Sequence, residues 1–127
     1  MDGKEANTIT GLLYGNLLQR DADKEGFSYY YDALTARKIT LRKAIAEFLC
    51  SEEFTEKFIV NQTPNELAKH LLNSLFGSRS VKPGEPKKVA GELIRKGFPA
   101  VVERLIADTR FEDQHGEFGV PKYVERR

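Results

Sequence analysis

Residues 40–54 read TLRKAIAEFLCSEEF, and residues 97–111, which lie 57 positions later, read GFPAVVERLIADTRF. In each stretch, apolar side chains recur three and four residues apart, the spacing that places them on one face of an α-helix. Five apolar positions of the first stretch are apolar again in the second: Leu41, Ile45, Phe48, Leu49 and Phe54 correspond to Phe98, Val102, Leu105, Ile106 and Phe111. The repeat predicts a fold built from two similar helical halves.

The same helical spacing of apolar residues extends over nearly the whole chain, and no run of strict alternation is long enough for a strand. TPNE at 63–66 has the pattern of a capping box, and Thr40 and Ser51 are suited to begin helices. Gly77 and Gly97 are suited to end them. We therefore expect an all-α fold, a compact single-domain bundle of about seven or eight helices built from two similar halves.

The expected domain organisation follows from these signals. Residues 1–8 form an N-terminal flank, residues 9–115 form the helical domain, and residues 116–127 form an extended C-terminal tail. The two halves cover about 9–60 and 63–115, and the Pro- and Gly-containing segment 77–86 is predicted to be a surface loop. Neither half is long enough to bury a core alone, so we expect both to pack as one body.

The composition excludes several classes of protein. Of 127 residues, 40% are hydrophobic and 31% charged, and the formal net charge is +1. Such a near-neutral chain lacks the basic signature of a nucleic-acid-binding domain. One Cys excludes an internal disulfide framework and a Cys-based zinc finger. The longest uncharged stretch, residues 6–19, is too short and too polar to span a bilayer, so we expect neither nucleic-acid binding nor direct membrane insertion.

No group of residues predicts catalysis. DADKEG at 21–26 resembles the start of a calcium-binding helix–loop–helix, but position 12 is Asp32, where a bidentate Glu is needed. An Asp-rich connector that caps the next helix is the simpler interpretation. His70 and His115 have no partner at a catalytic or metal-binding spacing. We expect no catalytic, metal or cofactor-binding residues, which favours an interaction module over an enzyme.

Aromatic and basic residues remain as candidates for contact with a partner. Tyr29, Tyr30 and Tyr31 are consecutive on a predicted helix, so at least one ring lies in the core and at least one near the surface. Two interpretations of these rings are open. They pack in the core with their hydroxyls reaching water, or an exposed ring serves as an aromatic anchor for a partner protein. Arg20 and Arg79 lie at the end of the first helix of each half. The simplest role of such a cation is to satisfy the last carbonyl groups of the helix, and the alternative is to bind a ligand.

Several of these motifs together resemble the phycobilisome linker domain. In the first half they are Tyr14, LLQR at 17–20, DADKEGFSYY at 21–30 and SEEF at 51–54. In the second half they are LFGSR at 75–79, GF at 97–98, Phe111 and FGVP at 118–121. The resemblance extends from about residue 9 to residue 123. The near-neutral charge fits a rod–core linker or a core–membrane linker repeat better than a basic rod linker.

The resemblance implies a non-catalytic linker whose partners are phycobiliproteins, allophycocyanin or phycocyanin or both, and in addition other linker domains. Such a linker organises the light-harvesting antenna and tunes excitation energy transfer. It carries no cofactor of its own, because the bilins belong to its partners. It is expected within the phycobilisome, peripheral to the cytoplasmic face of the thylakoid membrane. The candidate partner-binding residues are Arg20, Tyr29, Tyr30, Arg79, Phe118, Val120, Pro121 and Tyr123.

Two alternatives remain open at this point. The first half alone also resembles a broader group of bacterial helical repeat modules that are unrelated to photosynthesis. A calcium-binding helix–loop–helix module is the second alternative, for which the loop at 21–26 is the only support.

Overall fold

The computed structural model describes residues 1–123, and all regular structure in that range is helical. It contains the α-helices α1 (Gly3–Leu12), α2 (Lys24–Thr35), α3 (Leu41–Leu49), α4 (Glu52–Phe54), α5 (Pro64–Phe76), α6 (Glu85–Lys96), α7 (Phe98–Ala107) and α8 (Thr109–His115). The π-helical turns η1 (Leu13–Leu18) and η2 (Thr55–Ile59) continue α1 and α4, and the 3-10 turn η3 (Ser78–Ser80) follows α5. The predicted all-α fold is confirmed.

Helix boundaries follow the capping signals of the sequence. The Thr63 hydroxyl accepts from the Glu66 N–H while the Glu66 carboxylate accepts from the Thr63 N–H, so the capping box is complete. The hydroxyls of Thr40 and Ser51 cap α3 and α4 by accepting from the N–H groups of Lys43 and Phe54. α5 and α6 end at Gly77 and Gly97, both with positive φ. α1 begins at Gly3, capped by the Asp2 side chain, so most of segment 1–8 is helical.

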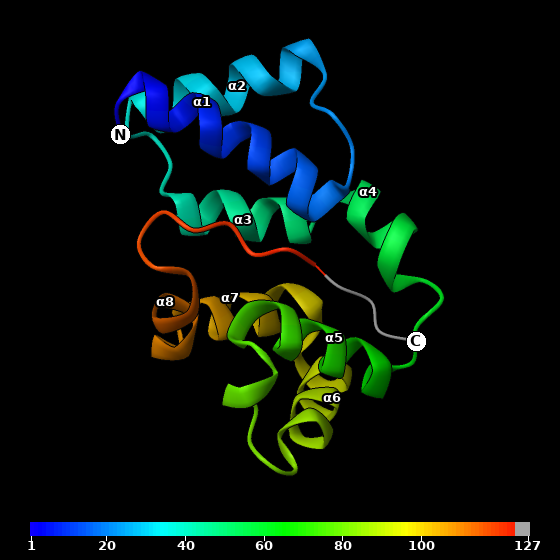
Figure 1. The fold of residues 1–127 in the computed structure, drawn as a ribbon. Helices are drawn as coiled ribbons and strands as arrows, with labels where there is room; N and C mark the ends of the chain where they lie inside the picture. Colours follow the sequence, from blue (N-terminus) through cyan, green and yellow to red (C-terminus); the bar gives the residue numbers. More distant parts are fainter. Residues whose placement is uncertain (124–127) are drawn as a thin grey trace.

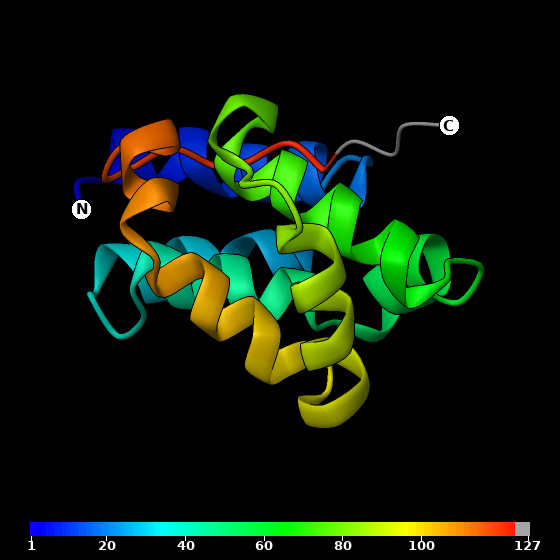
Figure 2. The ribbon, with the colours of Figure 1, turned by 90° about the horizontal axis from the view of Figure 1, so that it is seen from below.

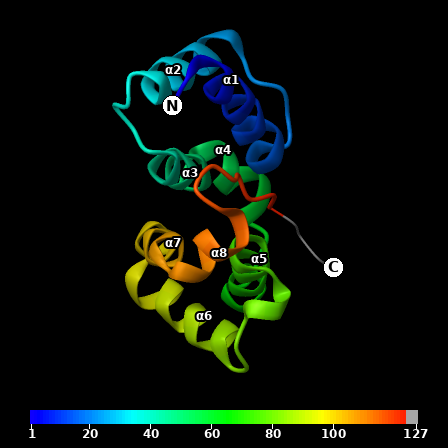
Figure 3. The same ribbon diagram turned by 60° about the vertical axis from the view of Figure 1, so that its left-hand side comes forward.

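The element order of the first four helices is repeated by the last four (Figure 1). In the first half, α1 and its continuation η1 pack against α2, α3 and α4. In the second half, α5 packs against α6, α7 and α8 in the same way. Figure 3 shows the two groups of helices stacked one above the other, with α3 facing α7. This arrangement agrees with the 57-residue repeat in the sequence.

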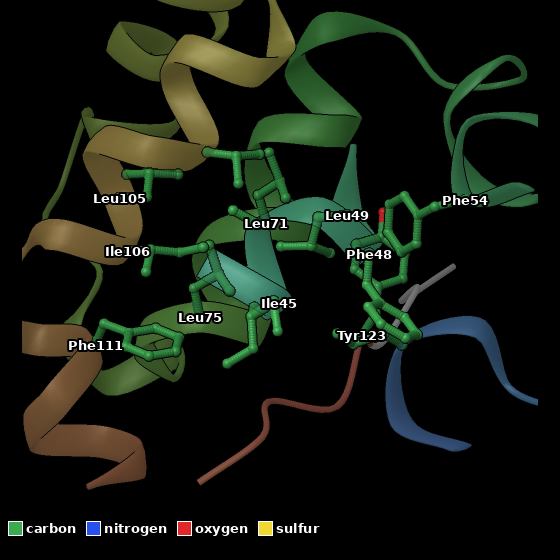
Figure 4. Packing of buried hydrophobic residues seen from close by; sticks show 14 of the residues in the cluster. Ile45, Phe48, Leu49, Phe54, Leu71, Leu75, Leu105, Ile106, Phe111 and Tyr123 are labelled. Carbon is green, nitrogen blue, oxygen red and sulfur yellow. The ribbon is translucent and has the colours of Figure 1, made fainter. Parts of the chain in front are cut away.

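The core is continuous across the boundary between the halves. Ile45 and Leu49 of α3 point toward Leu71 and Leu75 of α5 (Figure 4). Leu105 of α7 belongs to the same buried cluster. The repeated residues Phe54 and Phe111 are both fully buried. One core therefore serves eight short helices, none of which could bury its apolar face alone.

The C-terminal tail, described here for residues 116–123, returns from α8 across the molecule to η1 (Figures 1 and 2). Its last described residue, Tyr123, is only 1% exposed and packs edge-on against Phe54, with ring centroids 4.8 Å apart. The Tyr123 N–H donates to the Asn16 carbonyl at 3.2 Å, and Asn16 Nδ2 donates to the Val120 carbonyl at 3.1 Å. Residues 116–123 form no helix or strand, and they lie against helices of their own chain.

The equivalence of Phe54 and Phe111 leads to a paired prediction. Phe54→Ala and Phe111→Ala should each lower the free energy of unfolding by about 3–5 kcal/mol, because each removes a buried ring and leaves a cavity. Phe118→Ala, which truncates a ring that is 45% exposed, is the control and should cost less than about 1 kcal/mol. Urea denaturation followed by circular dichroism measures all three. A large loss for only one of the two buried rings would contradict the equivalence of the halves.

Candidate partner-binding surface

Arg20 is held by its own half of the molecule. The backbone turns after η1 at Gln19, which has φ +56°, and directs the Arg20 side chain toward α4. Arg20 Nε and Nη2 donate to the two carboxylate oxygens of Glu53 at 2.7 and 2.9 Å, and the guanidinium lies 5.1 Å from the centre of the Tyr14 ring. These two parallel hydrogen bonds join the end of the first helix to the fourth helix of the same half. The main role of Arg20 is therefore structural.

Glu53 is a strongly stabilised carboxylate. Hydrogen bonds from Arg20 and then from Lys57 lower the pKa of the Glu53 carboxyl from 4.5 to about 2. Lys57 Nζ donates both to Glu53 at 2.8 Å and to the Leu18 carbonyl at 3.0 Å. The Leu18 carbonyl lies at the end of the π-helical turn, so the irregular end of the helix is closed by a side chain.

Tyr30 and Tyr29 divide between core and surface, as consecutive helix positions must. The Tyr30 hydroxyl donates to Glu47 at 3.0 Å, and its ring lies 4.7 Å from Phe48. Burial and the bond to Glu47 raise the pKa of the Tyr30 hydroxyl. Tyr29 is 61% exposed and meets the Tyr30 ring edge-on at 5.0 Å. Tyr30, Glu47 and the Arg20–Glu53 pair border a shallow hollow of about 200 Å³.

Arg79 is exposed in η3 and forms no ion pair within the described residues. The structural role that Arg20 has in the first half belongs to Arg110 in the second. Arg110 donates to Glu85 and Asp108, and its guanidinium lies 4.2 Å from the centre of the Phe76 ring. The sequence does not reveal this role of Arg110, because Arg110 lies on the fourth helix of its half and not, as Arg20 does, at the end of the first.

The four tail candidates differ in accessibility. Phe118 is exposed and borders an open groove of about 500 Å³, whose apolar wall contains Leu34, Ile39 and Leu41. Val120 is half-buried, and Pro121 and Tyr123 are buried. In this arrangement a partner reaches the Phe118 ring directly, whereas the Tyr123 ring belongs to the core.

The remaining titratable groups provide no chemical centre within residues 1–123. Asp23 of the acidic loop accepts from the Gly26 N–H and caps α2, as expected for a connector. Among the described side chains, no group of three or more metal-binding residues comes together. His115 Nε2 lies 3.0 Å from the Leu75 carbonyl, and burial lowers the pKa of its imidazole. No helix in this range is long and apolar enough to cross a membrane.

The Arg20–Glu53 pair predicts a specific dependence of stability on pH. Because the pKa of Glu53 is lower in the folded chain than in the unfolded chain, this pair stabilises the fold above pH 4.5, and that contribution is lost as the pH falls toward 2. Glu53→Gln should lower the melting temperature at pH 7 and flatten its decline between pH 4.5 and 2. Glu52→Gln, which removes an exposed carboxylate without an ion pair, is the matched control. Equal slopes for Glu53→Gln and the unaltered protein would contradict this prediction.

Comparison with known proteins agrees with the motifs and the helical fold. A search of curated proteins found no match to the sequence. The family described as "Phycobilisome Linker polypeptide" matches residues 1–124, which is nearly the whole chain. The chain therefore belongs to the phycobilisome linker polypeptide family.

Proposed function

We propose that this chain binds phycobiliproteins, allophycocyanin or phycocyanin or both, and holds them in place within the light-harvesting antenna. The observation that carries the proposal is the family match over residues 1–124. Linkers of this family are structural proteins, and the pigments of the assembly are carried by the phycobiliproteins. In this proposal the chain is not an enzyme, has no cofactor of its own, and works within the phycobilisome at the cytoplasmic face of the thylakoid membrane.

The groove beside Phe118 is the surface best suited to a protein partner. Leu34, Ile39 and Leu41 offer an apolar wall, and the Phe118 ring stands exposed at its edge. Arg37, which also lines the groove, has no ion pair within the described residues and adopts a positive φ of 57°. An accessible aromatic ring next to an unpaired Arg is the combination that often dominates binding energy in protein interfaces.

Tyr29, Tyr30 and Arg79 are secondary contact candidates, since all three retain some exposure. Aromatic and charged side chains placed beside a bilin of the partner would alter its packing and local field, and this is how we propose that the chain tunes energy transfer. The tail is held against the helices by Val120, Pro121 and Tyr123. These residues therefore support the proposed contact surface from inside the molecule. Arg20 supports the hollow beside Tyr30.

The proposal is tested by mixing the purified chain with allophycocyanin and with phycocyanin. We expect co-elution with at least one of them and a change in its absorption or fluorescence spectrum. Phe118→Ala should weaken this binding about 5- to 30-fold, the effect of removing an aromatic anchor, without a change in melting temperature. Val60→Ala, which truncates an apolar side chain that is 63% exposed outside the groove, is the control and should bind normally.

Failure to bind any phycobiliprotein would contradict the proposed function. Normal binding by Phe118→Ala would show that the groove is not the contact surface. The two alternatives from the sequence, a repeat module unrelated to photosynthesis and a calcium-binding module, are not favoured by the family match.

A further inference from the structure

The outer face of α6 is basic and has no internal partner. Lys87, Lys88 and Arg95 are exposed on this face and form no ion pair within the described residues. The two acidic residues of the helix are both engaged elsewhere: Glu85 binds Arg110, and Glu92 binds Arg104 at 2.7 Å. Every charge that α6 presents to solvent on this face is therefore positive.

An apolar side chain lies next to these charges, near the C-terminal end of α6. Ile94 is 73% exposed, the most exposed of the large hydrophobic residues described. One helical turn earlier, Gly91 leaves the helix surface open, because a Cβ atom there would meet only the Arg95 guanidinium. Lys87, Gly91 and Arg95 are four residues apart and therefore share one side of the helix. An apolar side chain with cations around it is suited to contact an acidic surface.

A complementary face exists on the helix formed by α4 and η2. Glu52, Glu56 and Val60 follow at intervals of four residues, and all three are exposed. Within residues 1–123, neither Glu52 nor Glu56 forms an ion pair, whereas the nearby cation Lys57 is bound to Glu53. This face therefore combines two free carboxylates with an exposed Val at its C-terminal end.

We propose that the α6 face of one copy docks on the α4–η2 face of a second copy of this chain. Val60 meets Ile94, and Glu52 and Glu56 lie opposite the Lys and Arg side chains. The patches have similar lengths, since Glu52 to Val60 and Lys87 to Arg95 are nine residues each, and the eight steps along α6 span about 12 Å. Both charge and apolar content are therefore complementary.

The helices that carry the two faces belong to different halves of the molecule, and α4 and α6 lie apart in the fold (Figure 1). The contact is heterologous because it joins two different faces, and the pair retains one free α4–η2 face on one copy and one free α6 face on the other. Such contacts extend into open chains unless the rotation closes a ring. Exposed ion pairs contribute little individually and are screened by salt, so this association is weak and sensitive to ionic strength.

A charge-swap experiment tests the proposal. The full chain should self-associate in sedimentation velocity at about 20 mM NaCl and dissociate at about 500 mM, where the Debye length falls to a few ångströms. In the double variant Lys87→Glu with Arg95→Glu, the α6 face becomes acidic like the α4–η2 face. In the double variant Glu52→Lys with Glu56→Lys, the α4–η2 face becomes basic like the α6 face. Each double variant alone should remain a monomer at low salt, and an equimolar mixture should associate again, because opposite faces are then restored.

Two controls separate this contact from general effects of charge and from misfolding. Lys38→Glu with Lys69→Glu makes the same change of charge on other exposed positions and should still associate. Ile94→Ala keeps every charge and should weaken association about tenfold, with the circular dichroism spectrum unchanged.

A monomeric protein at low salt, self-association of either double variant alone, or no association of the mixture would overturn the proposal. The result is independent of the phycobiliprotein-binding assay, since the groove beside Phe118 contains none of the exchanged residues. Loss of phycobiliprotein binding by the α6 variants without any self-association of the unaltered chain would assign that face to another partner and would also overturn the proposal.

Discussion

The buried Tyr123 ring ties the end of the chain to the first half of the molecule. This residue comes from the tail that follows the last helix, yet it packs against Phe54 and Phe58 of the first half. Gln62 Nε2 donates to its hydroxyl at 3.1 Å and Gln19 Nε2 to its carbonyl at 3.1 Å, so both polar ends of the residue are satisfied. Together with the contact between α3 and α7, this anchor closes the chain into one body.

The repeated helices were predictable from the sequence, and the tail contacts were not. Apolar periodicity and capping signals depend only on residues close together in the chain. The helices that contain Phe54 and Phe111 and the capping box at Thr63 could therefore be predicted from the sequence. Tyr123 contacts residues more than 100 positions away, and an extended segment has no periodicity that reveals its partner. The π-helical turn that leaves the Asn16 and Leu18 carbonyls free for the tail and for Lys57 also has no sequence signature.

The interior arrangement explains why the candidate site residues have different roles. Arg20, Pro121 and Tyr123 were predicted from motifs, and a motif records a structural requirement as readily as a contact with a partner. The structure places these three in internal contacts and leaves Tyr29, Arg79 and Phe118 accessible. A family of linkers can keep such internal anchors while the outer surface changes to suit different partners. The exposed grooves and charged helix faces are therefore where we expect the function of this chain to lie.

If the chain binds phycobiliproteins as proposed, we expect it to do so as a preformed rigid body. Hydrogen exchange of the free chain and of its phycobiliprotein complex is the most direct test. Exchange in the complex should be slower at the backbone around the Phe118 groove and unchanged in the buried helices α3 and α7. Faster exchange in α3 and α7, or in the tail up to Tyr123, would show that the halves separate on binding and would rule out a rigid body.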